Sequence, residues 1–380
     1  MKVCIFCHDS YMSGANLALK DWIDDNKQDQ FILVIPHKNV QFKNEFKNKN
    51  IKVVVGNYFC LVKNLTKMPL MYCIKKSLKK IYMVTIGKLF LQRLYSKLNQ
   101  INPDVVISNS FVLIYGALYS QKNHKKHVWY IREFMEEDHM ITHYNKKQIK
   151  KLAEESYALY ISEVIESKYQ KIYHFRKCVT IYDKIAFEKK YKRIIPKFQN
   201  EPLHAIMAGS LSLGKGQWDA IFAVEKLTRK GYKIMLDIYG DGPIKKDIEN
   251  YLRERKLDNI SLKGFSTDLN KLRSRYDLAF VCSKNEALGR VTVEAMYYGN
   301  LVLGANSGFT KYIVQDKQTG ILYKSGNVDD LVLKLENVYQ NATENNKIIR
   351  NAQKYALNNF SKSISLKIEL YLKLVIGDEV

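Results

Sequence analysis

Two glutamates near residue 290 have a spacing that suits contact with a sugar. In the stretch EALGRVTVEAM, Glu286 and Glu294 lie eight positions apart, and Gly289 stands between them. Glu286 follows the apolar run LAFVCS, and Glu294 lies one turn into a helix that is predicted to begin at Arg290. A carboxylate can accept two hydrogen bonds from a vicinal diol such as that of a ribose. Two carboxylates so placed could hold the two ends of a nucleotide sugar.

A second stretch, MAGSLSLGKGQWDAI, is predicted to bind phosphate. Gly209 ends an apolar strand, and Lys215 and Gly216 stand where the next helix begins. A lysine beside the unpaired amides of a helix N-terminus favours an anion. The segment is not a Walker loop, because Gly216 stands where that motif needs Ser or Thr. The stretch IYGDGP lacks the third glycine of a dinucleotide fingerprint, so it is weak evidence for NAD.

Strands alternate with helices along the whole chain. In the first half the predicted strands are KVCIFC, FILVIP, IKVVVG, DVVISNS, KHVWYI, ALYIS and KCVTIYD. The second half begins at HAIMAG and repeats the alternation as far as the helix VDDLVLKLENVY. This order predicts an α/β fold with two doubly wound, Rossmann-like parallel sheets. Ligands of such sheets bind beyond the carboxyl ends of the strands, and two facing sheets would place the site in the cleft between them.

One break in this pattern divides the chain into two predicted domains. The segment KIAFEKKYKRIIPKFQNEPL is basic and irregular and contains two of the six prolines. We therefore predict an N-terminal domain over residues 1–184, a linker over 185–202 and a C-terminal domain over 203–361. A last helix at about 362–380 is predicted to pack back on the N-terminal domain.

The positive charge is unevenly distributed. The net charge is +23, and 12 of the excess positive charges lie between Phe46 and Pro103, where there is no Asp or Glu. Such a window attracts an anionic membrane surface or a nucleic acid; the alternative is a solvated basic face. A helix predicted over residues 70–98 suits docking on anionic lipid, while the alternative for its apolar side is packing in the core. No nucleic-acid recognition motif accompanies the charge, which disfavours that partner.

The second half resembles the donor-binding domain of retaining glycosyltransferase family 4, the glycosyl transferases group 1, which has the GT-B fold. The matching motifs occur in the family's order between about Leu203 and Asp330: GSLSLGKGQ, LDIYGDGP, ISLKGF, CSKNEALGRVTVEAMYYG, LVLGANSG and DKQTGILY. In the first half, MSGAN is similar to the family's glycine loop and YIREFMEEDH to its cleft loop. The resemblance implies an acceptor-binding N-terminal domain and a C-terminal domain that binds a nucleotide-sugar donor.

The resemblance also implies roles for single residues. Glu294 would bind the nucleotide ribose, Glu286 would contact hydroxyls of the donor sugar, and Lys215 would neutralise the pyrophosphate. His139 or Arg132 would lie near the acceptor hydroxyl or the donor C1. The other predicted donor-site residues lie in glycine loops and at helix starts: Gly14, Gly209, Ser210, Ala287, Leu288, Gly289 and Arg290.

This chain departs from the family pattern at two places. The family usually has arginine where this chain has Ser210, and we expect Arg290 to supply the missing charge. The family also often has Gly-Gly and a glutamate where this chain has Gly308 with Phe309 and Lys311. Both changes bear on the identity of the donor.

The reaction implied by the resemblance is front-face displacement with retention, in which the departing diphosphate takes the acceptor proton. The protein would position the substrates and stabilise the leaving group, so no strong base, metal or cofactor is expected. The expected donor is a UDP-sugar. The expected acceptor is a hydroxyl of a lipid-linked glycan in capsule, exopolysaccharide or cell-envelope polysaccharide synthesis. We expect a cytoplasmic protein, peripheral at the inner face of the cell membrane.

Other interpretations of the sequence stay open. They are a GT-B sugar-nucleotide epimerase, a protein-glycosylating transferase, and a basic protein that binds membrane or nucleic acid without activity. The pair His139 and His143 does not form a zinc-protease motif, because Met140 stands where that motif needs glutamate. A hydrogen-bonding role is therefore favoured over a metal site.

Overall fold

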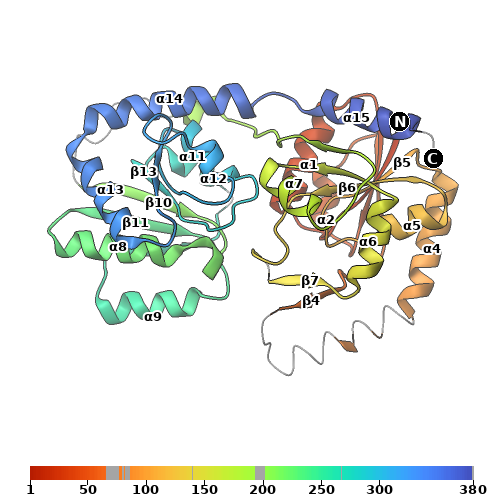
Figure 1. Cartoon of the computed structure of the whole chain (residues 1–380), viewed down its shortest axis with the longest axis horizontal. Helices are drawn as coiled ribbons and strands as arrows, with labels where there is room; N and C mark the ends of the chain where they lie inside the picture. Colours follow the sequence, from red (N-terminus) through yellow and green to blue (C-terminus); the bar gives the residue numbers. More distant parts are fainter. Residues whose placement is uncertain are drawn as a thin grey trace. The chain divides into compact units, whose positions relative to one another are not determined.

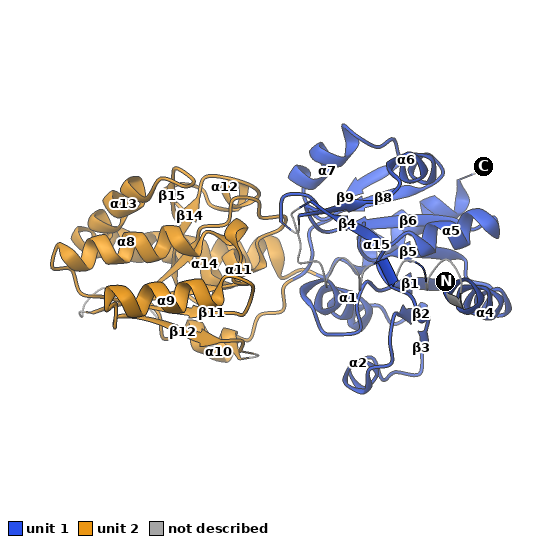
Figure 2. Cartoon of the chain, turned by 90° about the horizontal axis from the view of Figure 1, so that it is seen from below, with its two compact units in different colours: residues 1–184, 363–380 blue, residues 185–362 orange. Residues whose placement is uncertain are grey.

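Two compact units make up the chain in this computed structural model. Unit 1 comprises Met1–Lys184 with Ser363–Val380, and unit 2 comprises Ile185–Lys362 (Figure 2). The structure describes residues 1–65, 77–78, 81, 86–138, 140–192, 202–266 and 268–378. His139, half of the predicted linker (193–201) and part of the basic window between Phe46 and Pro103 lie outside the described residues.

Unit 1 is built on a parallel sheet whose strand order is β3-β2-β1-β5-β6-β8-β9 (Figure 2). Its strands are β1 (Lys2–Phe6), β2 (Gln30–Ile35), β3 (Ile51–Val55), β5 (Val105–Ser108), β6 (Lys126–Ile131), β8 (Tyr157–Tyr160) and β9 (Cys178–Thr180). A separate antiparallel pair joins β4 (Val62–Asn64) to β7 (Ile141–His143) (Figure 1). The strand order reverses between β1 and β5, which is the position where doubly wound sheets bind ligands.

The helices of unit 1 are α1 (Gly14–Asp25), α2 (Val40–Glu45), α4 (Ile86–Ile101), α5 (Tyr115–Lys122), α6 (Lys146–Glu154), α7 (Glu163–Gln170) and α15 (Ser365–Gly377). Of these, α5 packs against β1, β5 and β6, and α7 packs against β8. In α6, Ile149 and Leu152 are buried while the lysines around them are exposed, which is the period of an amphipathic helix. Helix α15 is joined to the sheet by Tyr371, whose hydroxyl lies 2.9 Å from the carbonyl oxygens of Ala158 and Lys177.

Unit 2 has a second parallel sheet, in the order β12-β11-β10-β13-β14-β15. Its strands are β10 (Leu203–Ala208), β11 (Ile234–Tyr239), β12 (Ile260–Gly264), β13 (Leu278–Val281), β14 (Leu301–Ala305) and β15 (Ile321–Tyr323). Its strand order reverses between β10 and β13, so that these two neighbours form the switch point of this sheet.

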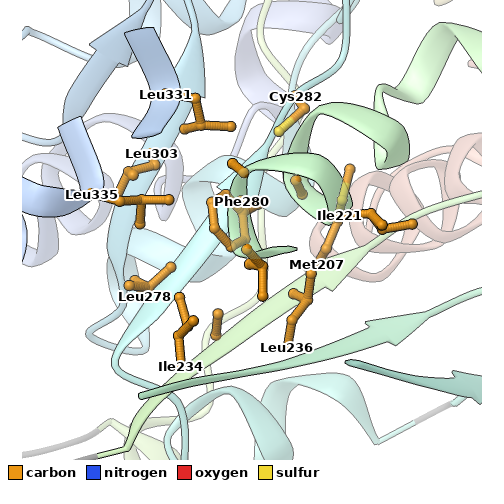
Figure 3. Close-up of a cluster of buried hydrophobic side chains, with 14 of the residues drawn as sticks. Met207, Ile221, Ile234, Leu236, Leu278, Phe280, Cys282, Leu303, Leu331 and Leu335 are labelled. Atoms are coloured by element: carbon orange, nitrogen blue, oxygen red, sulfur yellow. The ribbon is translucent and has the colours of Figure 1, made fainter. Parts of the chain in front are cut away.

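Helices cover both faces of the sheet in unit 2. They are α8 (Gln217–Arg229), α9 (Lys245–Arg255), α10 (Leu269–Arg273), α11 (Arg290–Tyr297), α12 (Thr310–Ile313), α13 (Val328–Gln340) and α14 (Ala342–Phe360). Short 3-10 turns lie at Lys189–Tyr191 and Leu213–Lys215. Side chains of Leu278 and Phe280, two positions apart on β13, share one core with Ile221 of α8 and Leu335 of α13 (Figure 3). Helix α11 packs with α14 and also against β13 and β14.

Five differences from the sequence prediction concern helices. Helix α1 begins at Gly14, inside the segment predicted as a loop. Helices α2, α5, α7 and α14 are not among those predicted by the alternation of apolar segments. None of the helices in the described parts of the chain has the length and hydropathy needed to cross a membrane.

Candidate functional site

Three of the predicted donor-site residues of unit 2, Gly209, Lys215 and Glu286, line one small pocket, whereas Glu294 is not part of its lining. The pocket has a volume of about 60 Å³ and lies at the carboxyl ends of β10 and β13. Its lining includes Gly209, Lys215, Ser283 and Glu286. These residues come from two segments about 70 positions apart in the chain, which the switch point of the sheet brings together.

Lys215 and Glu286 form an ion pair inside this pocket. The Lys215 Nζ atom lies 3.0 Å from Glu286 Oε2, and the two side chains are 26% and 13% exposed. Both charges therefore reach the solvent, although most of each side chain is covered. The pair places a cation, suited to a phosphate, beside a carboxylate, suited to sugar hydroxyls.

A close backbone contact fixes the position of Glu286. The loop after β14 passes so near that a Cβ atom at Gly308 would lie 2.4 Å from the amide nitrogen of Glu286. The amide of Phe309 also donates a hydrogen bond of 2.8 Å to the carbonyl of Glu286. Gly308 has a φ of +52°, which disfavours a side chain there as well. The loop GANSG thus packs against the backbone of Glu286 and fixes its position.

The glycines of IYGDGP have a comparable structural role. A Cβ atom at Gly240 would lie 1.8 Å from the carbonyl oxygen of Gly209, so the loops after β10 and β11 touch only because Gly240 has no side chain. The amide of Leu211 donates to the carbonyl of Asp241 at 3.0 Å. This segment therefore determines the conformation of the loop that is predicted to bind phosphate. Comparison with the dinucleotide fingerprint did not reveal this role.

Two helices begin beside the pocket with glycine at the N-cap. Gly216 precedes α8 and Gly289 precedes α11, and both have left-handed backbone angles. Helix α11 begins at Arg290, as the sequence predicts. The first amides of a helix have no partner within it, and they carry partial positive charge. Ala287 and Leu288, just before Gly289, are buried.

Glu294 lies in α11 between two arginines. Its Oε2 atom is 3.2 Å from Nη2 of Arg273, and its Oε1 atom is 4.0 Å from Nε of Arg290. Arg273 is 2% exposed, whereas the side chain of Arg290 is 23% exposed. Sequence reasoning missed Arg273, because it stands among other basic residues in LNKLRSR and nothing in the letters distinguishes it.

Arg290 is predicted to supply the charge that is missing at Ser210, but neither residue lines the pocket. Ser210 is exposed, and its carbonyl accepts a 2.8 Å hydrogen bond from the side chain of Gln217. Arg290 is not among the residues that line the pocket, and Val291 is. The role of Arg290 as a replacement charge stays a prediction.

In unit 1, two of the predicted residues, Gly14 and Arg132, belong to the described part of the chain and follow β1 and β6. Gly14 begins α1, and a Cβ atom there would have nothing within 4 Å. Arg132 follows β6 and is 8% exposed. Its guanidinium is ion-paired with Asp183, donates to Asn109 Oδ1 at 2.8 Å, and lies 3.5 Å from the ring centre of Tyr130. Burial alone would lower the pKa of Arg132, but the charge of Asp183, its hydrogen bond and the nearby Tyr130 and Glu133 together outweigh burial and raise that pKa.

Further polar groups follow β1 and β6 in unit 1. His8 Nε2 lies 3.0 Å from Asp9 Oδ2, and Asn16 donates to the other Asp9 oxygen at 2.6 Å. Burial alone would lower the pKa of His8, but the hydrogen bond and charge of Asp9 raise it above its ordinary value. Glu133 accepts hydrogen bonds from the Ser110 hydroxyl and the Phe111 amide.

The comparisons with known proteins agree on the class of the fold. The model of the family described as "Glycosyl transferases group 1" matches residues 188–355. A poly(ribitol-phosphate) alpha-N-acetylglucosaminyltransferase of Staphylococcus aureus is 25% identical over 123 residues, which are 32% of this chain and 25% of that protein. The chain spans between 19% and 53% of the length of the curated relatives that it matches.

Solved structures resemble the whole chain. HepE of Anabaena in complex with UDP and glucose is 20% identical, with a TM-score of 0.78 over 98% of this chain and 100% of that one. Sucrose-phosphate synthase of Thermosynechococcus elongatus is 13% identical, with a TM-score of 0.76 over 100% of both chains. The fold is therefore GT-B, with two Rossmann-like parallel-sheet units, as the sequence predicts.

Proposed function

We propose that this protein is a glycosyltransferase that takes a sugar from a nucleotide-sugar donor, of which a UDP-sugar is the first candidate. The Lys215–Glu286 ion pair in the pocket of unit 2 is the observation that carries this proposal. It places a cation and a carboxylate 3.0 Å apart at the switch point of a parallel sheet, beside two helix N-termini. A diphosphate with a sugar attached needs this combination of groups.

In this proposal the diphosphate binds against Lys215 and the amides at the starts of α8 and α11. Glu286 accepts hydrogen bonds from hydroxyls of the donor sugar, and Glu294 accepts them from the ribose diol. As the bond from the sugar to the diphosphate breaks, negative charge grows on the leaving oxygen. Lys215 and the helix N-termini stabilise that charge, and groups fixed before the reaction do so without reorganisation.

The finer assignment rests on the sequence resemblance to family 4. It comprises retention by front-face displacement, with the departing diphosphate as the acceptor of the proton and without metal or cofactor. Unit 1 would bind the acceptor, with His139 or Arg132 near the reacting atoms and Gly14 near the phosphates. Because the side chain of Arg132 is 5% exposed and is paired with Asp183, His139 is the first candidate of the two. The proposed acceptor is a lipid-linked glycan of capsule, exopolysaccharide or cell-envelope polysaccharide synthesis.

A membrane-facing role would follow from the distribution of charge. The basic window between Phe46 and Pro103 would attract an anionic membrane at the cytoplasmic side, where a lipid-linked acceptor is held. In the described part of this window, Lys88 and Lys97 are exposed on α4. A vesicle sedimentation assay with and without anionic lipid tests this part of the proposal separately from the donor site.

The proposal is tested by measuring release of the free nucleotide, which is a diphosphate from UDP-, GDP- and ADP-sugars and a monophosphate from CMP-sugars. Hydrolysis or transfer with one donor, lost in Glu294→Ala, is the expected result. Proton NMR of the anomeric product then decides between retention and inversion. No turnover with any donor, together with salt-sensitive binding of vesicles or DNA, would favour a basic binding protein without activity.

A further inference from the structure

The Glu294 carboxylate is in contact with a buried cation, the guanidinium of Arg273. Nη2 of Arg273 lies 3.2 Å from Glu294 Oε2, and the Arg273 side chain is 2% exposed while that of Glu294 is 17% exposed. The carboxylate thus reaches the surface, and its partner does not. A guanidinium on the buried side can fix the plane of the carboxylate and leave its outer lone pairs available to a ligand.

The backbone of Arg273 is fixed as well. Asn300, which is fully buried, donates from its side-chain amide to the carbonyl of Arg273 at 2.9 Å and to that of Tyr276 at 2.7 Å. Arg273 ends α10, and these contacts join the end of that helix to the start of β14. The backbone that carries the guanidinium is therefore held in place by the buried side chain of Asn300.

A second feature of Arg273 is a buried donor without a hydrogen bond. Its Nε atom is buried and has no hydrogen-bond partner among the described residues. Leaving a buried donor unpaired costs about 1–3 kcal/mol. A hydrocarbon side chain at this position would avoid that cost, and it would also remove the charge that Glu294 contacts.

Arg290 is a weaker candidate for the same task. Its Nε atom lies 4.0 Å from Glu294 Oε1, beyond hydrogen-bond distance, and its side chain is 23% exposed. A more exposed pair at longer distance is screened by water and fixes little. The two arginines are thus expected to differ in effect, although both lie beside the same carboxylate.

We propose that Arg273 is a positioning residue, which fixes the Glu294 carboxylate for a vicinal diol and so gives the site its preference for a ribonucleotide. The inference rests on the proposed function, because it takes a nucleotide as the ligand. Arg273 itself touches no substrate; it acts through Glu294.

The test compares the affinities of UDP and 2′,3′-dideoxy-UDP by calorimetry on the full chain. The two probes differ only in the diol, so their affinity ratio isolates the contact that Glu294 makes. The variants are Glu294→Gln, Arg273→Met, Arg273→Lys and the double variant Arg273→Met/Glu294→Gln. Arg275→Met is the matched control, because Arg275 is exposed and stands two positions further along the same segment.

The unaltered protein is expected to bind UDP about tenfold or more tightly than the dideoxy probe. Arg273→Met should bring this ratio close to that of Glu294→Gln, and the double variant should lower it no further. Arg273→Lys, which keeps the charge without the planar fork, should give an intermediate ratio. Arg275→Met should keep the full ratio. A general loss of structure would weaken both probes together and would leave the ratio unchanged.

Four results would overturn the inference or its premise. A full ratio in folded Arg273→Met overturns it, and a full ratio in Arg273→Lys does so if the Met variant fails to fold. Equal binding of the two probes by the unaltered protein also overturns it, while the proposed function stands. Binding of neither probe by the unaltered protein overturns the proposed function itself.

Discussion

The carboxyl edges of the two sheets carry charged side chains in different ways. In unit 2, at the ends of β10 and β13, Lys215 and Glu286 face a pocket and remain partly exposed. In unit 1, Arg132 follows β6 and Asp183 follows β9; their side chains are each 5% exposed and are joined to each other. Asn109 and the ring of Tyr130 complete the surroundings of Arg132.

The difference indicates that the charged side chains of the two edges have different roles. The charges of unit 2 are held by backbone contacts, such as that of Gly308 with Glu286, and their polar ends stay available to a ligand. The charges of unit 1 are used within the protein, where they join the ends of β5, β6 and β9. Substitutions at the two edges should therefore act on different quantities: ligand turnover in unit 2 and the stability of the fold in unit 1.

The largest expected effect is a loss of stability at the edge of unit 1. Arg132→Met should lower the free energy of unfolding by about 3–5 kcal/mol, because it leaves Asp183 buried without its cation. Urea unfolding followed by the fluorescence of Trp129, which is buried in the same unit, measures this change. Adding Asp183→Asn should recover part of the loss. A decrease below about 1 kcal/mol, as for an exposed ion pair, would contradict the contrast between the edges.

The second prediction concerns Lys215 in unit 2. Lys215→Met should reduce donor turnover by about 10²–10³-fold, the usual cost of removing one group that stabilises developing charge. The stability should change by less than about 1 kcal/mol, since the ion pair is partly exposed. Lys284→Met is the control, because Lys284 is exposed on the same loop as Glu286. Equal turnover in the two variants would contradict the proposed role of Lys215 in stabilising the leaving group at the pocket.

The third prediction is a difference in sensitivity to acid. Burial lowers the pKa of His127 to about 3, and the ring lies between the hydroxyls of Ser108 and Ser156 at 2.9 Å from each. The unfolded chain binds a proton at this ring below about pH 6.5 and the folded chain does not, so stability falls as the pH decreases from 6.5 towards 3. Between pH 6.5 and 5 the loss should be about 2 kcal/mol.

This loss should appear in unit 1. Burial also lowers the pKa of His143 to about 4, which acts in the same direction, whereas the one histidine of unit 2, His204, is exposed. Hydrogen exchange read separately on peptides of the two units measures the effect. His127→Gln should flatten the pH dependence of unit 1, and an unchanged slope in that variant would assign the acid sensitivity to other groups.

The smallest effect on stability is expected at Gly14. A Cβ atom there meets nothing within 4 Å, so Gly14→Ala at the first position of α1 should stabilise the protein by up to about 1 kcal/mol. If this glycine lets the chain approach the phosphates of a donor, the same change should lower turnover about tenfold or more. Thermal unfolding and turnover are measured on one preparation. A more stable variant with full turnover would remove Gly14 from the proposed site.

Much of the fold could be predicted because a buried parallel sheet leaves a simple trace in the sequence. Apolar runs such as LAFVCS and HAIMAG are continuous, and the helices between them are amphipathic. Helix α5 gave no such trace, because Tyr115, Ala117, Tyr119 and their neighbours are buried on several sides and the segment contains Gly116. Helix α14 is rich in asparagine, which has a low intrinsic preference for helix.

The residues of the site could be predicted only where they belong to a motif. Glu286, Glu294 and Lys215 stand at glycine turns whose spacing can be recognised. Arg273 could not be found in this way, because Lys271, Arg273 and Arg275 look alike in the sequence and only the tertiary structure buries one of them. The supporting role of Gly240 was equally hidden, since a close contact between two loops has no signature in either loop alone.

The central claim is that the edge of unit 2 holds the diphosphate of a nucleotide donor. A crystal structure of the protein grown with UDP tests it most directly. The account predicts the diphosphate beside Lys215 and the starts of α8 and α11, with the ribose hydroxyls on Glu294. A nucleotide bound elsewhere on the chain, with the Lys215–Glu286 pair intact and the pocket unoccupied, would contradict it.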